Sequence, residues 1–413
     1  MPSRDRRLRA ADRRSGGTWL GRHVRPEELV DQHQNARTET GLDAPGAATW
    51  PTVGRTTPAR TVLQRATRAG AVLAAAALLG SCAGGGTATR SATTPPPSPS
   101  ADASSEPGQN ATLPPVGGRL VASIAMPSPG SVETAFGSIW VTNGPEQTVT
   151  RLDPQTDAVI ARIPTPDPAT VVGVGAGAIW VTSFPGNSLT RIDPATNRVT
   201  RTISLAPRGA GPIGVTVFHG FVWVANHNGE PTTSVSKIEP ATMRVVDVIP
   251  VGAQPDAGPV WILSSAGSIW TNVNGNRNVV VRIDPHTDRI LATIPAPSAC
   301  TQLAADDTAV WGASGDDDSC TPGVSRIDPR TNTVTATFDE GGAADAVALY
   351  DGSLWYGTTT THKLGRINTR TNRVVSLLNL PGPAFGMTPG AGALWTTDRD
   401  DGLLFKVNPS ASS

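Results

Sequence analysis

The sequence predicts an all-β fold, a seven-bladed β-propeller closed by an N-terminal strand, because two columns of residues recur in step. In the first column an apolar residue precedes tryptophan, at intervals of 40, 43, 47, 41, 44 and 40 residues. These tryptophans are Trp140, Trp180, Trp223, Trp270, Trp311, Trp355 and Trp395. In the second column a basic residue precedes an apolar residue and then Asp, Glu or Asn, and the basic residues are Arg151, Arg191, Lys237, Arg282, Arg326, Arg366 and Lys406. A period of ~40–45 residues is typical of propeller blades, of which a ring contains ~4–8.

Each repeat contains the patterns of four short strands. In the repeat around 175–203, residues 178–182 are rich in strand formers and follow a glycine turn, and residues 188–193 read as a half-buried strand. Residues 198–203 alternate apolar and polar side chains, and the apolar stretch 213–218 precedes the next glycine turn. No helical period appears in the repeats. We expect each blade to contain an inner strand, a Trp strand, an Arg-x-Asp strand and an outer strand.

The segment between the third and fourth strands has the residues of a tight turn. Asp193 can accept hydrogen bonds from the backbone that follows it, and Pro194 fixes φ. Asn197 tolerates the left-handed conformation. The same residue types recur at this point in most repeats.

The two ends of the repeat region predict how the ring closes. The last repeat stops at 408–409, where its outer strand should begin. Residues 119–124, which precede the first repeat, resemble the outer strand 289–294. We expect 119–124 to complete the seventh blade, so that no sheet edge is left bare. The propeller then spans residues 119–410.

Both columns are expected to be structural, with a functional alternative for each. The tryptophans should pack between neighbouring blades as the main apolar mass, the alternative being that they line a binding surface. Arg151 and Asp153 lie two residues apart on one strand face, and we expect them to pair within or between blades. The alternative is a positive ring that binds polyanions.

Charge is divided unevenly along the chain. Residues 1–68 contain 13 Arg and 7 acidic residues, and residues 69–413 contain 21 basic and 27 acidic residues. The propeller is therefore mildly acidic, which argues against a nucleic-acid partner bound by a basic face. Residues 1–68 are poor in apolar residues and lack periodicity, so we expect them to be disordered.

Residues 69–80 form an apolar run that is too short to span a bilayer. The run follows Arg65 and Arg68 and ends in Leu-Gly-Ser-Cys82, so 69–82 resembles the signal peptide and lipobox of a bacterial lipoprotein, whose cysteine is lipidated. The alternatives are a plain secretory cleavage site and a buried helix. Residues 83–118 are rich in Pro, Ser, Thr and Gly and read as a linker. The chain should then be exported and held by lipid at the outer side of the cytoplasmic membrane.

A signal peptide normally begins close to the N-terminus, and 68 residues precede this apolar run. One explanation is that translation begins near Val53 or Val62, so that the first part of the chain is not made. The other is a cytoplasmic tail on an uncleaved anchor.

Two cysteines remain besides Cys82. Cys300 lies in the connection that leads into the inner strand of the fifth blade, and Cys320 lies between that blade's Trp strand and Arg-x-Asp strand. Both connections emerge at the same end of a propeller. In an oxidising compartment we expect a disulfide between Cys300 and Cys320. A metal pair would lack a nearby histidine.

The connections at one end of the ring are short, similar turns, whereas those at the other end, such as the loops after the Trp strands, are long and irregular. Binding residues concentrate on variable loops held by a rigid scaffold, so we expect the face with the long loops to carry function. We expect the site at the mouth of the central channel on this face. The candidates on or before the inner strands are Glu133, Asp167, Arg208, Asp256, Gln302, Asp345 and Phe385, and those in the loops are His227, Glu230 and His362.

Each loop candidate has an alternative interpretation. His227 and Glu230 could form an acid–base pair, or could be exposed loop residues. Asp316, Asp317 and Asp318 could ligate calcium, or could form a solvated loop. His362 is alone and can be a surface residue. The chain contains no glycine-rich phosphate loop and no Gly-x-Ser-x-Gly motif.

The motifs resemble known families. Gly-Ser-Ile-Trp140-Val-Thr-Asn followed by Thr-Val-Thr-Arg151-Leu-Asp-Pro is similar to the YVTN-type propeller repeat of exported bacterial proteins. His362-Lys-Leu-Gly-Arg-Ile367 resembles the corresponding strand of the virginiamycin B lyase family. That resemblance implies a seven-bladed propeller and a metal-assisted His/Glu site at the channel mouth that opens a cyclic lactone by elimination. The inner-strand connections of this chain contain no histidine, so no catalytic residue is carried over.

Two functions follow as hypotheses. The first is a monomeric binding or scaffold propeller without a cofactor, anchored to the membrane by lipid alone, whose partner is a peptide, a glycan or an envelope protein. The second is an enzyme at the channel mouth, either lyase-like or hydrolytic, and a lyase-like enzyme could use a divalent metal.

Overall fold

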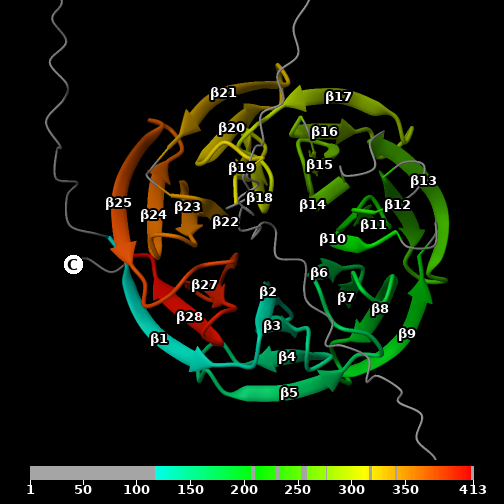
Figure 1. The fold of residues 1–413 in the computed structure, drawn as a ribbon. Coiled ribbons are helices and arrows are strands. Elements are labelled where there is room, and N and C mark those ends of the chain that lie inside the picture. Colours follow the sequence, from blue (N-terminus) through cyan, green and yellow to red (C-terminus); the bar gives the residue numbers. More distant parts are fainter. Residues whose placement is uncertain are drawn as a thin grey trace, which may run out of the picture. The chain divides into compact units, whose positions relative to one another are not determined.

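The computed structural model describes residues 117–205, 210–228, 233–252, 258–275, 277–315, 319–339 and 342–410. These residues form 28 strands in seven four-stranded antiparallel sheets, which are the blades of a propeller (Figure 1). The predicted all-β, seven-bladed fold is confirmed. The expected N-terminal segment, lipobox and all but the last two residues of the linker lie outside the described residues.

Each blade contains the four expected strands from the channel outward. The inner strands are β2 (Pro129–Ala135), β6 (Val172–Gly175), β10 (Pro212–Phe218), β14 (Gly258–Ser265), β18 (Leu303–Asp306), β22 (Ala344–Tyr350) and β26 (Gly386–Gly390). The Trp strands are β3 (Ser138–Asn143), β7 (Ala178–Ser183), β11 (Phe221–Asn226), β15 (Ser268–Asn274), β19 (Ala309–Ala313), β23 (Ser353–Thr358) and β27 (Ala393–Asp398).

The third strands carry the basic column. They are β4 (Thr148–Leu152), β8 (Ser188–Asp193), β12 (Thr233–Glu239), β16 (Val279–Ile283), β20 (Val324–Asp328), β24 (Lys363–Asn368) and β28 (Leu403–Asn408). The outer strands are β5 (Val159–Pro164), β9 (Arg198–Ser204), β13 (Arg244–Gly252), β17 (Ile290–Pro295), β21 (Thr333–Phe338), β25 (Arg373–Asn379) and β1 (Arg119–Ala125). No helix among the described residues is long and apolar enough to cross a membrane.

The first and last parts of the propeller share one blade, as the sequence predicts. Strand β1 pairs antiparallel with β28, so the order of the seventh blade is β1-β28-β27-β26 (Figure 1). The register runs from Arg119 opposite Asn408 to Ala125 opposite Leu403. The third strand of the last repeat thus has no bare edge, and the ring is closed by main-chain hydrogen bonds.

The tryptophan column forms the core between blades, which confirms its structural role. All seven column indoles are at most 1% exposed. Trp180 of blade 2, for example, packs in one cluster with Val215 and Val222 of blade 3. The indole Nε1 of Trp140 also donates to the carbonyl of Ala135 at 3.0 Å, which fastens the end of the inner strand. Burying these aromatic side chains is the main apolar gain in each blade.

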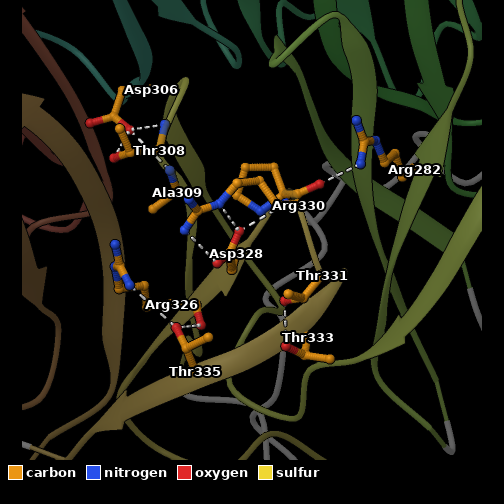
Figure 2. A network of polar contacts seen from close by, with 11 residues as sticks. Arg282, Asp306, Thr308, Ala309, Arg326, Asp328, Arg330, Thr331, Thr333 and Thr335 are labelled. Carbon is orange, nitrogen blue, oxygen red and sulfur yellow. Dashed lines mark hydrogen bonds and ion pairs between the residues drawn. The ribbon is translucent and has the colours of Figure 1, made fainter.

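The turn after each third strand is closed by its first residue, as expected. The Asp193 carboxylate accepts a hydrogen bond from the Ala195 backbone at 2.9 Å and from the Thr196 hydroxyl at 2.9 Å. These bonds hold the pKa of Asp193 below its usual range. Asn197 has φ of 55°, the left-handed conformation that the turn requires. Figure 2 shows the equivalent turn of blade 5, where Asp328 contacts Arg330.

The basic column is structural as expected, but the expected pair of Arg151 with Asp153 is wrong. The Arg151 guanidinium lies over the Trp140 ring and donates instead to the Pro194 carbonyl at 2.7 Å and to Asn197 Oδ1 at 2.8 Å, in the turn of the next blade. Arg282 makes the equivalent contacts with the turn of blade 5, to the Pro329 carbonyl at 2.6 Å and to Asn332 Oδ1 at 3.0 Å. Figure 2 shows Arg282 beside this turn. The acid is already occupied by its own turn, so the cation stacks on the indole and reaches sideways. The column therefore links blades.

Candidate functional site

The two ends of the ring differ in what they carry. One end, the turn face, holds the short turns that join inner strands to Trp strands and third strands to outer strands, together with the basic column. The other end, the loop face, holds the connections into the inner strands and the loops that follow the Trp strands. Because antiparallel strands alternate in direction, these two kinds of loop always emerge together.

The expected disulfide lies on the loop face and is present. The Cys300–Cys320 bond has a Cα–Cα distance of 6.5 Å and joins residues 20 apart in sequence. Blade 4 also contacts this disulfide region, because Asn274 Nδ2 donates a hydrogen bond to the Cys300 carbonyl at 2.7 Å. The bond fixes the loop after β19 against the connection into β18.

A cavity of about 290 Å³ occupies the central channel and is lined by the inner strands of all seven blades. One wall residue in each blade pairs with that blade's column tryptophan: Glu133, Gly173, Thr216, Leu263, Ala304, Ala348 and Thr388. Most of the lining residues are apolar, although polar and apolar atoms contribute equally to the surface that faces the cavity. Among the described residues, the polar residues on the wall are Glu133, Thr216, Gln302 and Thr388, besides Trp261. An apolar wall with a few convergent polar groups is typical of small-ligand sites.

Glu133 is the one charged side chain on the described wall of this cavity. Its Oε2 accepts a hydrogen bond from the Thr388 hydroxyl at 3.3 Å, across the junction of blades 1 and 7. Burial raises the pKa of Glu133 to about 7, against the opposing effect of hydrogen bonds from Thr388 and from the Thr134 backbone. The side chain is nevertheless partly exposed, because it borders the cavity. It is accessible to a small ligand and poorly solvated.

Gln302 links three inner strands at the end of the cavity nearer the loop face. Its Nε2 donates to the Met387 carbonyl at 2.8 Å, and its Oε1 accepts from the backbone of Val347 and Met387, both at 3.2 Å. Inner strands have an unpaired edge along the channel, so their N–H and C=O groups need partners. The Gln302 amide supplies three of these bonds. Its polar atoms are used for structure rather than left for a ligand.

Trp261 is a functional candidate that the sequence reasoning missed. It lies outside the tryptophan column, on inner strand β14, and lines the cavity. Its carbonyl accepts from the Thr271 hydroxyl at 2.7 Å and its amide donates to Asn272 Oδ1 at 2.7 Å, which hold this part of the strand. A Cβ at Gly214 of the neighbouring blade would lie 3.0 Å from the Trp261 Cα, so the close approach of the two inner strands requires glycine at this position. A tryptophan outside a periodic column is the signal that could have identified it.

Three of the other predicted residues lie on the loop face but do not line the cavity. Asp167 accepts a hydrogen bond from the Ser188 hydroxyl at 2.7 Å, within blade 2. The Asp345 carbonyl accepts from the Thr301 hydroxyl at 3.0 Å, between blades 6 and 5. The Phe385 ring lies under the Arg399 guanidinium, 4.0 Å away. Of the predicted site residues that the structure describes, the cavity wall brings together Glu133 and Gln302 alone.

The predicted histidines are separate from the cavity wall. His227 is largely buried and lies against Phe184, with ring centroids 6.2 Å apart. Burial lowers the pKa of His227, and its Nδ1 has no partner among the described residues. His362 is exposed. Three predicted residues, Arg208, Glu230 and Asp256, lie outside the described residues, as do Asp316, Asp317 and Asp318, so the acid–base pair and the calcium loop stay predictions.

A second buried carboxylate, Asp398, ends the Trp strand of blade 7. Its Oδ1 accepts from the backbone of Asp400 and Asp401, both at 3.1 Å, and burial raises its pKa. Ser183 has the same role in blade 2, where its hydroxyl accepts from Gly186 at 3.0 Å. Asp398 therefore closes a loop. Within the described part of the chain, no three His, Cys, Asp or Glu side chains are grouped so as to hold a metal ion.

Comparisons with known proteins agree with this fold. A scan against protein-family models found no match, and a search of curated proteins found none. A solved streptogramin B lyase is similar at 20% identity and a TM-score of 0.60, over 70% of this chain and 97% of the lyase. Virginiamycin B lyase from Staphylococcus aureus is similar at 16% identity and a TM-score of 0.59, over 70% of this chain and 99% of the lyase.

The hydrazine synthase of Kuenenia stuttgartiensis is also similar, at 13% identity and a TM-score of 0.58, over 69% of this chain and 96% of that one. Similarity at identities this low shows the fold, and an activity has to be inferred from the residues of the site. The chain is thus a seven-bladed β-propeller with structural similarity to virginiamycin B lyases.

Proposed function

We propose that this chain is an exported, lipid-anchored binding propeller that engages a peptide, a glycan or an envelope protein through its loop face and central channel. The observation that supports this most is the cavity at the centre of the ring. It combines an apolar wall, one carboxylate, two hydroxyls and an indole on seven fixed strands. Such a rigid and largely preformed site can bind part of a partner with little ordering cost.

The proposed location rests on the N-terminal sequence. Residues 69–82 have the order of a signal peptide followed by a lipobox, and the linker that follows can hold the propeller away from the membrane. The Cys300–Cys320 disulfide supports an oxidising compartment, since such bonds are rare in the cytosol.

The proposal is tested by filling the cavity. Ala304 lines the cavity, so Ala304→Phe should occupy part of it. Ala125→Phe is the matched control, because Ala125 is exposed on the outer strand of blade 7. Immobilised wild-type and variant chains would be incubated with envelope extract, and the retained components quantified by mass spectrometry. The proposal expects a component that Ala304→Phe loses and Ala125→Phe keeps. Equal retention by all three chains would contradict it.

A lyase-like or other hydrolytic enzyme is the second candidate, and its support is the structural similarity to two lyases. A divalent metal would then be expected to assist. Incubation with a streptogramin B antibiotic and Mg²⁺, followed by chromatography, distinguishes the two functions. Ring opening by elimination gives a linear isomer that separates from the cyclic substrate. Formation of this isomer by the wild-type chain, and its loss in Ala304→Phe, would favour the enzyme.

A further inference from the structure

Resting on the proposed function, we infer that the central cavity binds an alkylammonium group, which sits on the Glu133 carboxylate with its hydrocarbon arm against the apolar wall. The group belongs either to a free small amine or to a lysine side chain of the partner. The Glu133 carboxylate has no counterion on the described wall. Glu133 borders the cavity, and no basic side chain lines the described wall.

The two lysines of the basic column are engaged elsewhere. Lys406 pairs with Asp157 at 2.7 Å and Lys237 pairs with Asp288 at 2.7 Å, both on the turn face. The Thr388 hydroxyl donates only one neutral hydrogen bond to Glu133. A carboxylate kept from water without a cation is unfavourable, so it either holds a proton or accepts a positive group. Burial away from water is also what raises the pKa of Glu133.

The rest of the wall suits a cation with an apolar arm. Val174, Leu263 and Leu349 are among its partly exposed apolar residues, and Trp261 adds an aromatic residue. An indole attracts an ammonium or alkylammonium group through its π face. A volume of about 290 Å³ is on the order of ten water molecules at ~30 Å³ each. The cavity therefore admits a small amine or one long side chain, and excludes a folded segment.

Gln302, another polar residue on the wall, does not compete for this ligand. The Gln302 amide donates to Met387 and accepts from two backbone amides. An anion would meet the Glu133 carboxylate with no compensating cation on the wall. A neutral alcohol could bind the apolar surface, but it would gain nothing from the charge. The geometry thus favours a positive ligand over an anionic or neutral one.

Calorimetric titration of the purified full chain tests this inference with three probes. The probes are n-butylammonium chloride, n-butanol as its neutral counterpart, and Nα-acetyl-lysine-N-methylamide as a lysine side chain. Both ammonium probes are titrated into wild type, Glu133→Gln and Glu146→Gln at about pH 8, above the Glu133 pKa. Glu146 is an exposed carboxylate on the loop face, so Glu146→Gln is the matched control.

We expect at least one ammonium probe to bind wild type and Glu146→Gln equally, and to bind Glu133→Gln at least about tenfold more weakly. The butanol affinity should be the same in all three chains. Wild-type ammonium binding should also weaken as the pH falls from about 8 to about 5, because Glu133 takes up a proton. The probe with the higher affinity identifies the source, free amine or lysine.

Equal ammonium affinity in wild type and Glu133→Gln would overturn the inference, as would the absence of ammonium binding to wild type at millimolar concentration. The pH series needs no variant, so a folding defect in Glu133→Gln does not remove the test. A failure of this inference can be distinguished from a failure of the proposed function. If ammonium probes do not bind but Ala304→Phe still loses its envelope component, the inference is wrong and the binding role stands.

Discussion

Lys406 Nζ lies 2.7 Å from the Asp157 carboxylate and 2.7 Å from the Pro154 carbonyl, so the last repeat is fastened to the turn of the first. The same contact joins Arg151 of blade 1 to Asn197 of blade 2. The ring is thus closed twice, once by the pairing of β1 with β28 and once by a cation that crosses from blade 7 to blade 1. Lys237 joins blade 3 to blade 4 and Arg282 joins blade 4 to blade 5 by equivalent contacts, so the closing contact belongs to a recurring type.

Lys406→Met should lower the stability of the propeller. Lys406 also lies over the Trp395 ring at 5.0 Å, and methionine keeps that apolar contact while removing the charge. Loss of the two hydrogen bonds from a mostly buried ammonium should cost about 1–3 kcal/mol. Urea unfolding followed by tryptophan fluorescence measures it. Arg330→Met is the control. The Arg330 side chain, which pairs with Asp328, is 85% exposed, and exposed ion pairs contribute little to stability. Equal midpoints for the two variants would contradict the role of Lys406.

The Cys300–Cys320 disulfide should stabilise the loop face. It joins residues 20 apart, so the chain-entropy model gives roughly 3 kcal/mol for closing this loop. The double variant Cys300→Ala, Cys320→Ala should lose stability of that order in urea unfolding. Wild type treated with reductant should match the variant, while reductant should not change the variant itself. Two alkylatable thiols from these positions in the unreduced, denatured chain, counted by mass spectrometry, would show that the bond does not form.

The pH dependence of stability should carry the signature of Glu133. Its pKa is about 7 in the folded chain, against 4.5 for the ordinary value. The folded state therefore holds the proton more tightly than the unfolded state. The resulting stabilisation is complete below about pH 4.5 and is lost as the pH rises through about 7. It amounts to as much as about 3 kcal/mol at 1.36 kcal/mol per pKa unit.

The difference in unfolding free energy between wild type and Glu133→Gln isolates this effect. Wild type should lose stability relative to Glu133→Gln between about pH 5 and about pH 8. Other groups, such as His227, whose pKa burial lowers, act equally in both chains and cancel. Glu146→Gln provides the exposed control. A difference that does not change with pH would mean that Glu133 titrates as an ordinary carboxyl.

Cys82→Ala should separate the chain from the membrane. The expected lipobox supplies one lipidated cysteine, and changing it should release the chain or leave an unprocessed precursor. Fractionation of cells that express wild type or Cys82→Ala, followed by detection in membrane and medium, measures this. The double variant of Cys300 and Cys320 should remain in the membrane fraction. Wild-type chain found entirely in the medium would show that the lipoprotein interpretation is wrong.

The strands of each blade could be predicted from the sequence, but the side-chain contacts that join one blade to the next could not. The tryptophan column identified the Trp strands, and the segment 119–124 before the first repeat identified the closing strand, because both match a pattern that recurs along the chain. The partner of Arg151 lies in the next blade, more than 40 residues away, where local spacing gives no guidance. Arg191 shows the limit of the column, because the turn of blade 3 has Met243 where the turns of blades 1, 2, 4, 5 and 6 have Asp or Asn.

The candidate site was predicted in part for the same reason. Loop-face reasoning placed Glu133 and Gln302 among the candidates, and both line the cavity. The roles of these two residues depend on blades that are distant in sequence. Gln302 contacts Met387, which is 85 residues away, and Glu133 contacts Thr388, which is 255 residues away. Sequence spacing alone does not show which inner-strand residues face each other across the channel.

A crystal structure of the full chain soaked in n-butylammonium chloride tests most directly whether the central channel is a ligand site. We expect density for the amine inside the cavity, with its nitrogen within hydrogen-bond distance, about 2.7–3.2 Å, of the Glu133 carboxylate. Its alkyl arm should lie against Trp261 and the apolar wall. The same soak of Glu133→Gln crystals should leave this position without the amine. An amine bound only at exposed carboxylates on the outside of the ring, with the cavity unchanged from the unsoaked crystal, would contradict the account.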